Sequence, residues 1–405
     1  MNVVVVNDYA QVNGGASQVA LASAGALAHR GHEVTVFTAV GATAELPDHP
    51  GRARLICTGQ HEIARDPNRM RAALQGLWNQ HAARTMRELL NGLDPRDTVV
   101  HFHGWTKALS SSVIHECLSS GFPSVTTLHE YFSACPNGGF FDYQRQTICG
   151  RRPLGAACVA THCDARSYPQ KLWRVGRQYV QRVAGEFPGG MRHFITLSGF
   201  SMQVLKPYLP ADARFHAVPN PIDVPREAPV AVDAEEGFVY AGRLAPEKGG
   251  ILLARAARPL RASLTFVGDG EQRGAISAEY PQARITGWLA PAAVRRQLRR
   301  SRALVLPSLW YETQGLVVLE AAALGVPAIV PAGSAARDFV LDGVTGLWFR
   351  SGDENDLRDK LRMLQEDAGL AATLGKAAYE HFWRDPPTLD KHAARLEDVY
   401  RQVLN

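Results

Sequence analysis

Short apolar runs alternate with longer amphipathic stretches along most of this chain. Residues 3–6 form a β-branched run, a glycine turn follows, and residues 17–29 carry apolar side chains at helical spacing before a second run at residues 33–38. A strand–helix–strand succession predicts a parallel sheet, because parallel strands need a crossover connection. We expect further strands at residues 98–102, 124–128 and 193–197, and helices within residues 69–90, 110–118 and 170–184.

A proline-rich segment at residues 218–229 interrupts this pattern and predicts a linker. The alternation then resumes, which predicts a second domain of the same α/β class. We expect residues 1–217 and 218–387 to form two Rossmann-like, doubly wound domains that face a cleft, with a final helix at residues 388–405 packing back on the first domain. Strands are expected at residues 238–241, 264–267, 303–306 and 328–330, and helices at residues 291–299, 315–324 and 388–404.

The composition is that of a soluble globular protein. Of 405 residues, 46% are hydrophobic and 20% are charged, which is enough for two or three domains with sizeable cores. Apolar runs stay shorter than the roughly 18 residues of a membrane span. The opening segment, residues 1–8, lacks the basic start and the length of a signal peptide, so it predicts a buried strand and a cytoplasmic protein.

Positive charge is concentrated in the first half of the chain. Residues 1–217 carry 21 Lys and Arg against 15 Asp and Glu, whereas residues 218–405 carry 23 against 24. The excess is densest between Tyr143 and Arg182. An anionic acceptor, an anionic membrane surface and an ordinary solvated surface all fit this excess. Nucleic acid is not an expected partner, because no nucleic-acid-binding motif accompanies the charge.

A basic segment at residues 168–182 interleaves aromatic, apolar and cationic side chains around Trp173. Two interpretations remain open. The segment fits the ordinary surface helix of an α/β domain, and it also fits a basic amphipathic helix that rests peripherally on the inner face of the cell membrane.

Two glutamates, Glu312 and Glu320, stand between an apolar run at residues 303–306 and an alanine-rich stretch at residues 321–324. A strand–loop–helix unit of this kind places both carboxylates around the amino end of one helix. Backbone N–H groups there are unpaired and attract anions. Upstream, Arg243 and Lys248 add two positive charges. Although each could be an ordinary exposed side chain, together they predict a pocket for a sugar linked to a nucleoside diphosphate.

These residues resemble the GT-B glycosyltransferases of retaining family 4. The resemblance is carried in the second half by Gly242-Arg-Leu-Ala-Pro-Glu-Lys-Gly249, Val267-Gly-Asp-Gly270, the Glu312 and Glu320 pair, Gly325-Val-Pro327 and Asp342-Gly-Val-Thr-Gly346. In the first half it is carried by Gly14-Gly15, His101-Phe-His-Gly104 and Thr127-Leu-His-Glu130. It implies a hexosyltransferase that keeps the anomeric configuration by same-face attack and needs no divalent metal for catalysis.

The resemblance also implies roles for individual residues. Arg243 and Lys248 would stabilise the leaving diphosphate, and Glu312 and His129 would face the donor sugar; these four are the expected catalytic residues. Gln314 stands where the family usually has an aromatic or small residue, which leaves the sugar open. The residues expected to bind the nucleotide sugar are Gly14, Gly15, Gly268, Gly315, Leu316, Val317 and Glu320.

The expected donor is a UDP- or GDP-sugar, and the expected acceptor is a glycan or a lipid-linked saccharide. Bacterial polysaccharide or glycolipid biosynthesis is the setting that the resemblance favours. Two other functions stay open at this point. A sugar-nucleotide epimerase of the same fold would convert the donor without an acceptor, and a non-catalytic carbohydrate-binding protein would not turn it over.

Four of the six cysteines are clustered in one loop-like insertion, whereas Cys57 and Cys117 lie in apolar contexts that predict core packing. Four thiolates can hold one zinc ion tetrahedrally and thereby stabilise a loop without a core. Free thiols, disulfides and an iron–sulfur cluster are the alternatives. The candidate metal ligands are Cys135, Cys149, Cys158 and Cys163.

Overall fold

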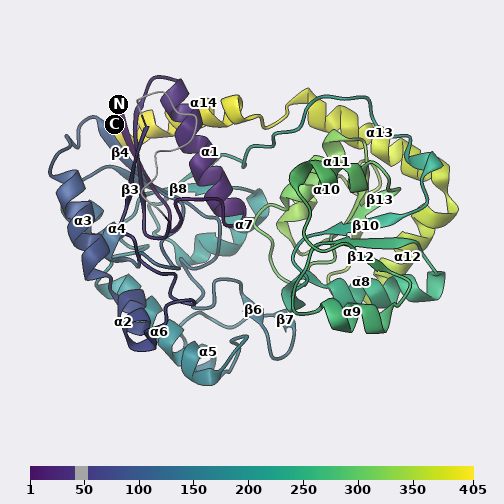
Figure 1. Ribbon diagram of the computed structural model, residues 1–405, viewed down its shortest axis with the longest axis horizontal. Coiled ribbons are helices and arrows are strands. Elements are labelled where there is room, and N and C mark those ends of the chain that lie inside the picture. Colours follow the sequence, from purple (N-terminus) through teal and green to yellow (C-terminus); the bar gives the residue numbers. More distant parts are fainter. Residues whose placement is uncertain (42–52) are drawn as a thin grey trace. The chain divides into compact units, whose positions relative to one another are not determined.

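A computed structural model describes residues 1–41 and 53–405 (Figure 1). Contacts divide the chain into two compact units. The amino-terminal unit comprises Met1–Gly139, Arg151–Pro221 and Pro387–Asn405, and the carboxy-terminal unit comprises Phe140–Gly150 and Ile222–Pro386. The boundary between the two units therefore falls between Pro221 and Ile222, inside the proline-rich segment, and the final helix belongs to the amino-terminal unit.

The amino-terminal unit is built on a seven-stranded parallel sheet with the order β3-β2-β1-β4-β5-β8-β9. Its strands are β1 (Asn2–Val6), β2 (Glu33–Thr38), β3 (Ala53–Cys57), β4 (Thr98–Phe102), β5 (Ser124–Thr127), β8 (His193–Thr196) and β9 (Arg214–Ala217). Its helices are α1 (Gly15–His29), α2 (Arg69–Leu77), α3 (Gln80–Leu90), α4 (Ser112–Ser119), α5 (Ala156–Ala160), α6 (Tyr168–Val183), α7 (Gly199–Leu205) and α14 (Leu389–Leu404).

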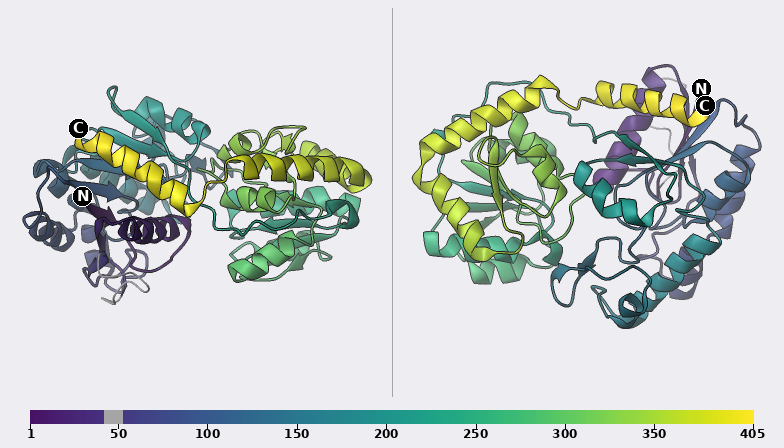
Figure 2. Two further views of the ribbon diagram at one scale, coloured as in Figure 1. Left: turned by 90° about the horizontal axis from the view of Figure 1, so that it is seen from above. Right: turned by 180° about the vertical axis from the view of Figure 1, so that it is seen from behind.

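Helix α14 completes the core of this unit. It packs against α1 and β4 (Figures 1 and 2), and its buried Leu396 and Tyr400 join a cluster with Leu27 of α1. His392 of α14 also bonds Ser23 of α1 through its Nε2 at 2.9 Å. The last residues of the chain thus hold the first βαβ unit in place.

The carboxy-terminal unit has a six-stranded parallel sheet with the order β12-β11-β10-β13-β14-β15, and Figure 2 shows helices on both faces of it. A two-stranded antiparallel hairpin, β6 (Phe141–Asp142) and β7 (Thr147–Ile148), is assigned to the same unit. The sheet strands are β10 (Phe238–Ala241), β11 (Leu264–Val267), β12 (Arg284–Ile285), β13 (Ala303–Val305), β14 (Ala328–Pro331) and β15 (Gly346–Phe349). The helices are α8 (Gly250–Ala257), α9 (Arg273–Glu279), α10 (Pro291–Leu298), α11 (Leu316–Ala323), α12 (Glu354–Glu366) and α13 (Ala368–Arg384).

The strands expected from sequence lie in the interior of both large sheets, and the strands of these sheets that were not expected lie at the edges. Interior strands such as β1 and β13 are buried on both faces, so their sequences are continuous apolar runs. Edge strands such as β3 and β9 are half-exposed and lack that signal. The expected helical stretch 69–90 is two helices, because the Asn79 side chain accepts the N–H of Ala82 and starts α3 anew.

No helix within residues 1–41 and 53–405 is long and apolar enough to cross a lipid bilayer.

Candidate functional site

The predicted phosphate-binding residues lie at the topological switch point of the carboxy-terminal sheet. Strand β10 is flanked by β11 on one side and β13 on the other, so the loops that follow β10 and β13 leave neighbouring carboxyl ends. In open parallel sheets this position is where ligands bind. The first loop carries Arg243 and Lys248, and the second carries Glu312 and leads into α11.

Lys248 and Glu312 meet across these two loops. The Lys248 ammonium lies 2.8 Å from Oε1 of Glu312 and 4.7 Å from the centre of the Trp310 ring, and Ser308 donates its hydroxyl to the same carboxylate oxygen at 2.6 Å. Burial works to raise the pKa of Glu312, which is 8% exposed. The Lys248 charge and the hydrogen bonds outweigh that effect, so the pKa lies below its ordinary value. Glu312 is therefore an anion that holds Lys248 in position.

Gly249 makes this meeting possible. Its φ of +71° is in the left-handed region, and a Cβ at this position would overlap the carbonyl oxygen of Pro307. The two loops approach closely enough for Leu309 to donate its N–H to the Glu247 carbonyl at 2.9 Å. Only glycine permits both the backbone angle and the close approach.

Arg243 lies on the same loop but is held differently. Its guanidinium donates to Glu247 at 2.6 Å, and its side chain is 57% exposed whereas Glu247 is buried. The structure thus joins Lys248 and Glu312 directly and fixes Arg243 through a separate carboxylate. The adjoining Gly268 follows β11 and lies against Gly242, with which a Cβ would collide.

The amino end of α11 presents unpaired donors. Gly315 caps the helix with a φ of +85°, and among the described residues no acceptor faces the N–H groups of Leu316 and Val317. Glu320 is partly buried one turn further on. Burial raises the pKa of Glu320, opposed only by the charge of Arg295, and its carboxylate has no hydrogen-bond partner among the described residues. The N–H groups of Leu316 and Val317 and the Glu320 carboxylate can therefore form hydrogen bonds with a polar ligand.

The amino-terminal unit carries a second group of predicted residues at the carboxyl ends of β1, β4 and β5. A small cavity of about 50 Å³ is lined there by residues from the start of α1, among them Asn13 and Ser17, and by His129. Gly14, with a φ of +95°, starts α1, and its carbonyl accepts the Ser17 hydroxyl at 3.0 Å. Gly14 and Gly15 thus position the helix start beside this cavity.

His129 is one of three imidazoles in contact. Its Nε2 lies 2.9 Å from Nδ1 of His103, and the His103 ring lies 4.0 Å from that of His101, centre to centre. His101 is fixed at both nitrogens, by Tyr400 and by Thr127, each at 2.7 Å. Burial, with a smaller effect from His392, lowers the pKa of His129 to about 3. At neutral pH His129 is therefore an uncharged hydrogen-bonding group.

This cavity also contains a residue that the sequence analysis missed. Asp8 is the second residue after β1 and accepts the N–H groups of Lys107, Ala108 and Leu109 at 2.8 to 3.0 Å. Burial raises its pKa, and the three N–H groups oppose the shift. Its position at the end of the first predicted strand was a usable signal, since side chains there face the ligand edge of a parallel sheet. In the other unit, Ser308 was missed because it has no motif of its own.

The four clustered cysteines are divided between two places in the structure. No group of three or more His, Cys, Asp and Glu among the described residues is arranged to hold a metal ion. Cys135, Cys158 and Cys163 are buried near Lys171, whose ammonium lies 3.5 Å from the Cys158 sulfur. Burial works to lower the pKa of Lys171, but the three cysteines raise it overall. Cys149 belongs to the other unit by its contacts.

Two half-buried imidazoles predict a pH dependence of the free energy of unfolding. His129 and His193 have pKa values lowered to about 3 and about 4, against 6.5 for the ordinary group, so between these values the unfolded chain binds more protons than the folded one. The contribution of these imidazoles to the free energy of unfolding is fully present above pH 6.5 and is lost as the pH decreases toward 4. For each imidazole the loss is at most about 1.4 kcal/mol per pH unit. Urea unfolding between pH 7 and 5 measures this. The His129→Asn variant should show a shallower dependence, and an unchanged slope would contradict the assignment.

Family models match both halves of the chain. A model described as Glycosyltransferase Family 4 matches residues 13–226, and one described as Glycosyl transferases group 1 matches residues 235–367. D-inositol 3-phosphate glycosyltransferase of Xylanimonas cellulosilytica is 26% identical over 96% of this chain and 92% of its own length. Sulfoquinovosyl transferase SQD2 of Arabidopsis thaliana is 32% identical, but the match covers 37% of this chain and only 31% of that protein.

Solved structures show the same fold. Sucrose-phosphate synthase from Thermosynechococcus elongatus superimposes with a TM-score of 0.71 at 19% identity, covering 99% of this chain and 98% of that one. Anabaena HepE, solved in complex with UDP, gives a TM-score of 0.67 at 15% identity over 99% and 100% of the two chains. One family model spans more than half of the sequence, and the two parallel sheets and the loops at the switch point are consistent with it. The chain belongs to glycosyltransferase family 4, with the GT-B fold.

Proposed function

We propose that this protein transfers a sugar from a nucleoside-diphosphate donor to a saccharide or lipid-linked acceptor with retention of the anomeric configuration. One observation carries the proposal: at the switch point of the carboxy-terminal sheet, the Lys248 ammonium, held by Glu312, shares the ligand edge with the unpaired N–H groups that start α11. Positive charge and free donors at one place fit a diphosphate.

In the proposed reaction the bond between the anomeric carbon and the diphosphate oxygen breaks, and negative charge develops on that oxygen. Lys248, Arg243 and the amides of α11 stabilise this charge more in the transition state than in the ground state. The acceptor hydroxyl attacks from the same face and passes its proton to the leaving phosphate. His129, uncharged at neutral pH, hydrogen-bonds a sugar hydroxyl. No carboxylate acts as a covalent nucleophile in the proposed reaction.

The donor is tested by ligand-induced thermal stabilisation with UDP, GDP and ADP and their common sugars. UDP is the first candidate, because the structural relative HepE was solved with UDP and with UDP-glucose. One nucleoside diphosphate should raise the unfolding temperature by several degrees, since a ligand at 100 times its Kd adds about 2.7 kcal/mol of stability. NMR of the product then reports the anomeric configuration. A failure of every nucleotide to stabilise the protein would contradict the proposal, and conversion of the donor without an acceptor would indicate an epimerase.

Glu320→Ala is expected to weaken binding of the nucleoside diphosphate by about 10- to 100-fold, because the proposed role of this carboxylate is to accept hydrogen bonds from the ribose hydroxyls. Calorimetric titration measures the change. Glu366→Ala removes the same charge from an exposed position at the end of α12 and should bind normally. Equal affinities for the two variants would remove Glu320 from the nucleotide site.

Peripheral contact with a membrane surface forms part of the proposal. Helix α6 exposes Leu172, Tyr179 and Val183 on one face, at spacings of seven and four residues. Apolar side chains on the exposed face of a helix fit the boundary between the headgroups and the acyl chains of a bilayer. The protein should therefore sediment with vesicles that contain anionic phospholipid, and an L172D/V183D variant should stay in solution. Equal sedimentation of both would exclude α6 as the contact.

We also propose a structural zinc ion, with Cys135, Cys149, Cys158 and Cys163 as its ligands. Among the described residues these side chains are not arranged to hold a metal ion. The proposal rests on the clustering of four thiols in one insertion. Metal analysis of protein purified without chelator decides it: about one zinc per chain supports the site, and a metal-free chain whose clustered thiols react with a thiol reagent contradicts it.

A further inference from the structure

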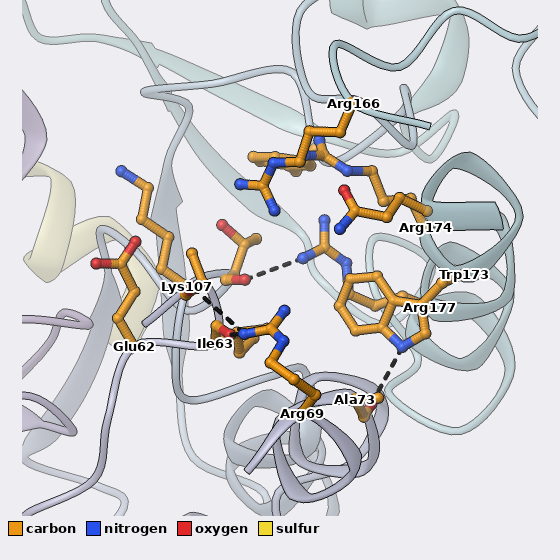
Figure 3. Close-up of a pocket in the computed structure, with 13 residues that line it drawn as sticks. Glu62, Ile63, Arg69, Ala73, Lys107, Arg166, Trp173, Arg174 and Arg177 are labelled. Carbon is orange, nitrogen blue, oxygen red and sulfur yellow. Dashed lines mark hydrogen bonds between the residues drawn. The ribbon is translucent and has the colours of Figure 1, made fainter. Parts of the chain in front are cut away.

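A larger cavity of about 360 Å³ lies in the amino-terminal unit, between the start of α2, the loop after β4 and helix α6 (Figure 3). Its lining is strongly cationic, since Glu62 is the one acidic side chain among the described residues that line it. Trp173 and Phe132 supply the aromatic part of the wall. The basic residues that line the cavity are Arg69, Lys107, Arg166, Arg174 and Arg177.

Arg177 is the most buried of these cations, with 9% of its surface exposed. It donates to the Thr106 carbonyl at 3.0 Å, and its guanidinium carbon lies 4.9 Å from the centre of the Phe132 ring and 5.3 Å from that of Trp173. Burial, reinforced by Arg174, lowers the pKa of Arg177 to about 10, although the more distant carboxylates of Glu130, Asp8 and Asp164 act in the opposite direction. No carboxylate among the described residues forms an ion pair with it. Such a buried charge is expensive unless an anion balances it.

The other cations of the cavity add to this positive charge. Arg69 donates to the backbone carbonyl of Ile63 at 2.8 Å, and neither Arg69 nor Arg166 has an ion-pair partner among the described residues. Arg174 is neutralised by Asp164 at 2.9 Å. Figure 3 shows the side chains of Arg69, Arg166 and Arg177 around one open space. Mutual repulsion of these cations costs stability, so the arrangement fits a site that takes an anion.

The cavity adjoins the one that contains His129. Thr106, Lys107 and Phe132 line both. An anion among the arginines would therefore hold its attached group next to the imidazole to which the proposed function assigns a contact with the reacting sugar. All of these residues belong to the amino-terminal unit.

We propose that this cavity binds a phosphate or diphosphate group of the acceptor, which makes the acceptor a phosphorylated saccharide or a diphosphate-linked one. The inference rests on the proposed glycosyl transfer. Planar guanidinium groups match phosphate oxygens in pairs, and several cations are more than a single carboxylate needs. The volume accommodates the phosphate together with part of a sugar.

The test is calorimetric titration of the whole protein with inorganic pyrophosphate, inorganic phosphate and glucuronate. The protein is first saturated with the nucleoside diphosphate found by thermal stabilisation, so that the donor site is occupied. Pyrophosphate should bind at one site per chain. The double variant R69M/R166M should bind it at least about tenfold more weakly, because each exposed guanidinium supplies charge-assisted hydrogen bonds. Arg84→Met removes one positive charge from an exposed position on α3, outside the cavity, and should match the unmodified protein. Arg177→Met is a second test, because this variant, where it folds, should also bind pyrophosphate more weakly.

The outcomes separate the inference from the function on which it rests. Unaltered pyrophosphate binding in R69M/R166M, or no binding to the nucleotide-saturated protein, overturns the cavity assignment even if sugar transfer is found. Glucuronate that binds as tightly as phosphate overturns the choice of phosphate. Conversely, the expected binding pattern in a protein that transfers no sugar supports the anion site and contradicts the transferase proposal.

Discussion

Lys248→Ala should lower kcat by about 10²- to 10³-fold with the donor identified by thermal stabilisation, the size of effect that follows loss of one preorganised group facing a developing negative charge. The ammonium of Lys248 is largely shielded from solvent and held at 2.8 Å by Glu312, so little reorganisation is needed during the reaction. Steady-state kinetics measure the change. Arg255→Ala, which removes an exposed cation from α8, should keep kcat within about twofold.

A structural role for Lys248 is separated from a catalytic one by a second variant. Lys248→Ala leaves Glu312 buried without its cation, which costs about 3 kcal/mol of unfolding free energy. The K248A/E312Q double variant removes the stranded charge, so it should regain most of the stability and still lack activity. If the double variant regains turnover as well, Lys248 acts only by supporting the loop.

Gly249→Ala is expected to destabilise the carboxy-terminal unit by about 2 to 3 kcal/mol and to reduce turnover with it. The new methyl group would meet the Pro307 carbonyl, and the backbone angle of Gly249 is unfavourable for alanine. Relief of that collision would separate the loop of Lys248 from the loop of Glu312. Urea unfolding gives the free energy, and kinetics give the turnover.

Gly274→Ala is the matched control for this substitution. Gly274 lies in α9, where an added Cβ meets nothing within 4 Å. Alanine is the better helix former by up to about 1 kcal/mol, so this variant should be as stable as the unmodified protein or more so. A Gly249→Ala protein within about 0.5 kcal/mol of the unmodified one would show that the close approach to Pro307 does not matter.

The interior of both sheets was predictable from sequence, whereas the edges were not. Strands such as β1 and β13 are buried on both faces and therefore appear as continuous apolar runs. The two-residue β12 and the half-exposed β3 carry no comparable pattern. Helices α12 and α13 were also absent from the predicted elements, although Asp353 caps α12 in the usual way, by accepting the N–H groups of Asn355 and Asp356.

The site was predictable as a set of residues but not as a set of contacts. Lys248 and Glu312 are 64 positions apart, and they meet because β10 and β13 are neighbours in the sheet. The pairing of His103 with His129 depends in the same way on the order of β4 and β5. Strand order is a property of packing between distant segments, which a motif does not encode.

The basic segment illustrates a different limit. Its composition predicted either a surface helix or a membrane-facing one, and both interpretations assume that the cations point outward. In the structure α6 turns Lys171 and Arg177 into the protein. Which face of a helix is buried depends on its neighbours, here on Phe132 and Thr106 from other segments.

The most direct test of the account is a crystal structure of the protein with the nucleoside diphosphate that stabilises it most. We expect the diphosphate oxygens to lie within hydrogen-bond distance of the Lys248 ammonium, the Arg243 guanidinium and the N–H groups of Leu316 and Val317, with Glu320 at the ribose. A diphosphate bound elsewhere, with Lys248 still facing only Glu312, would contradict this expectation.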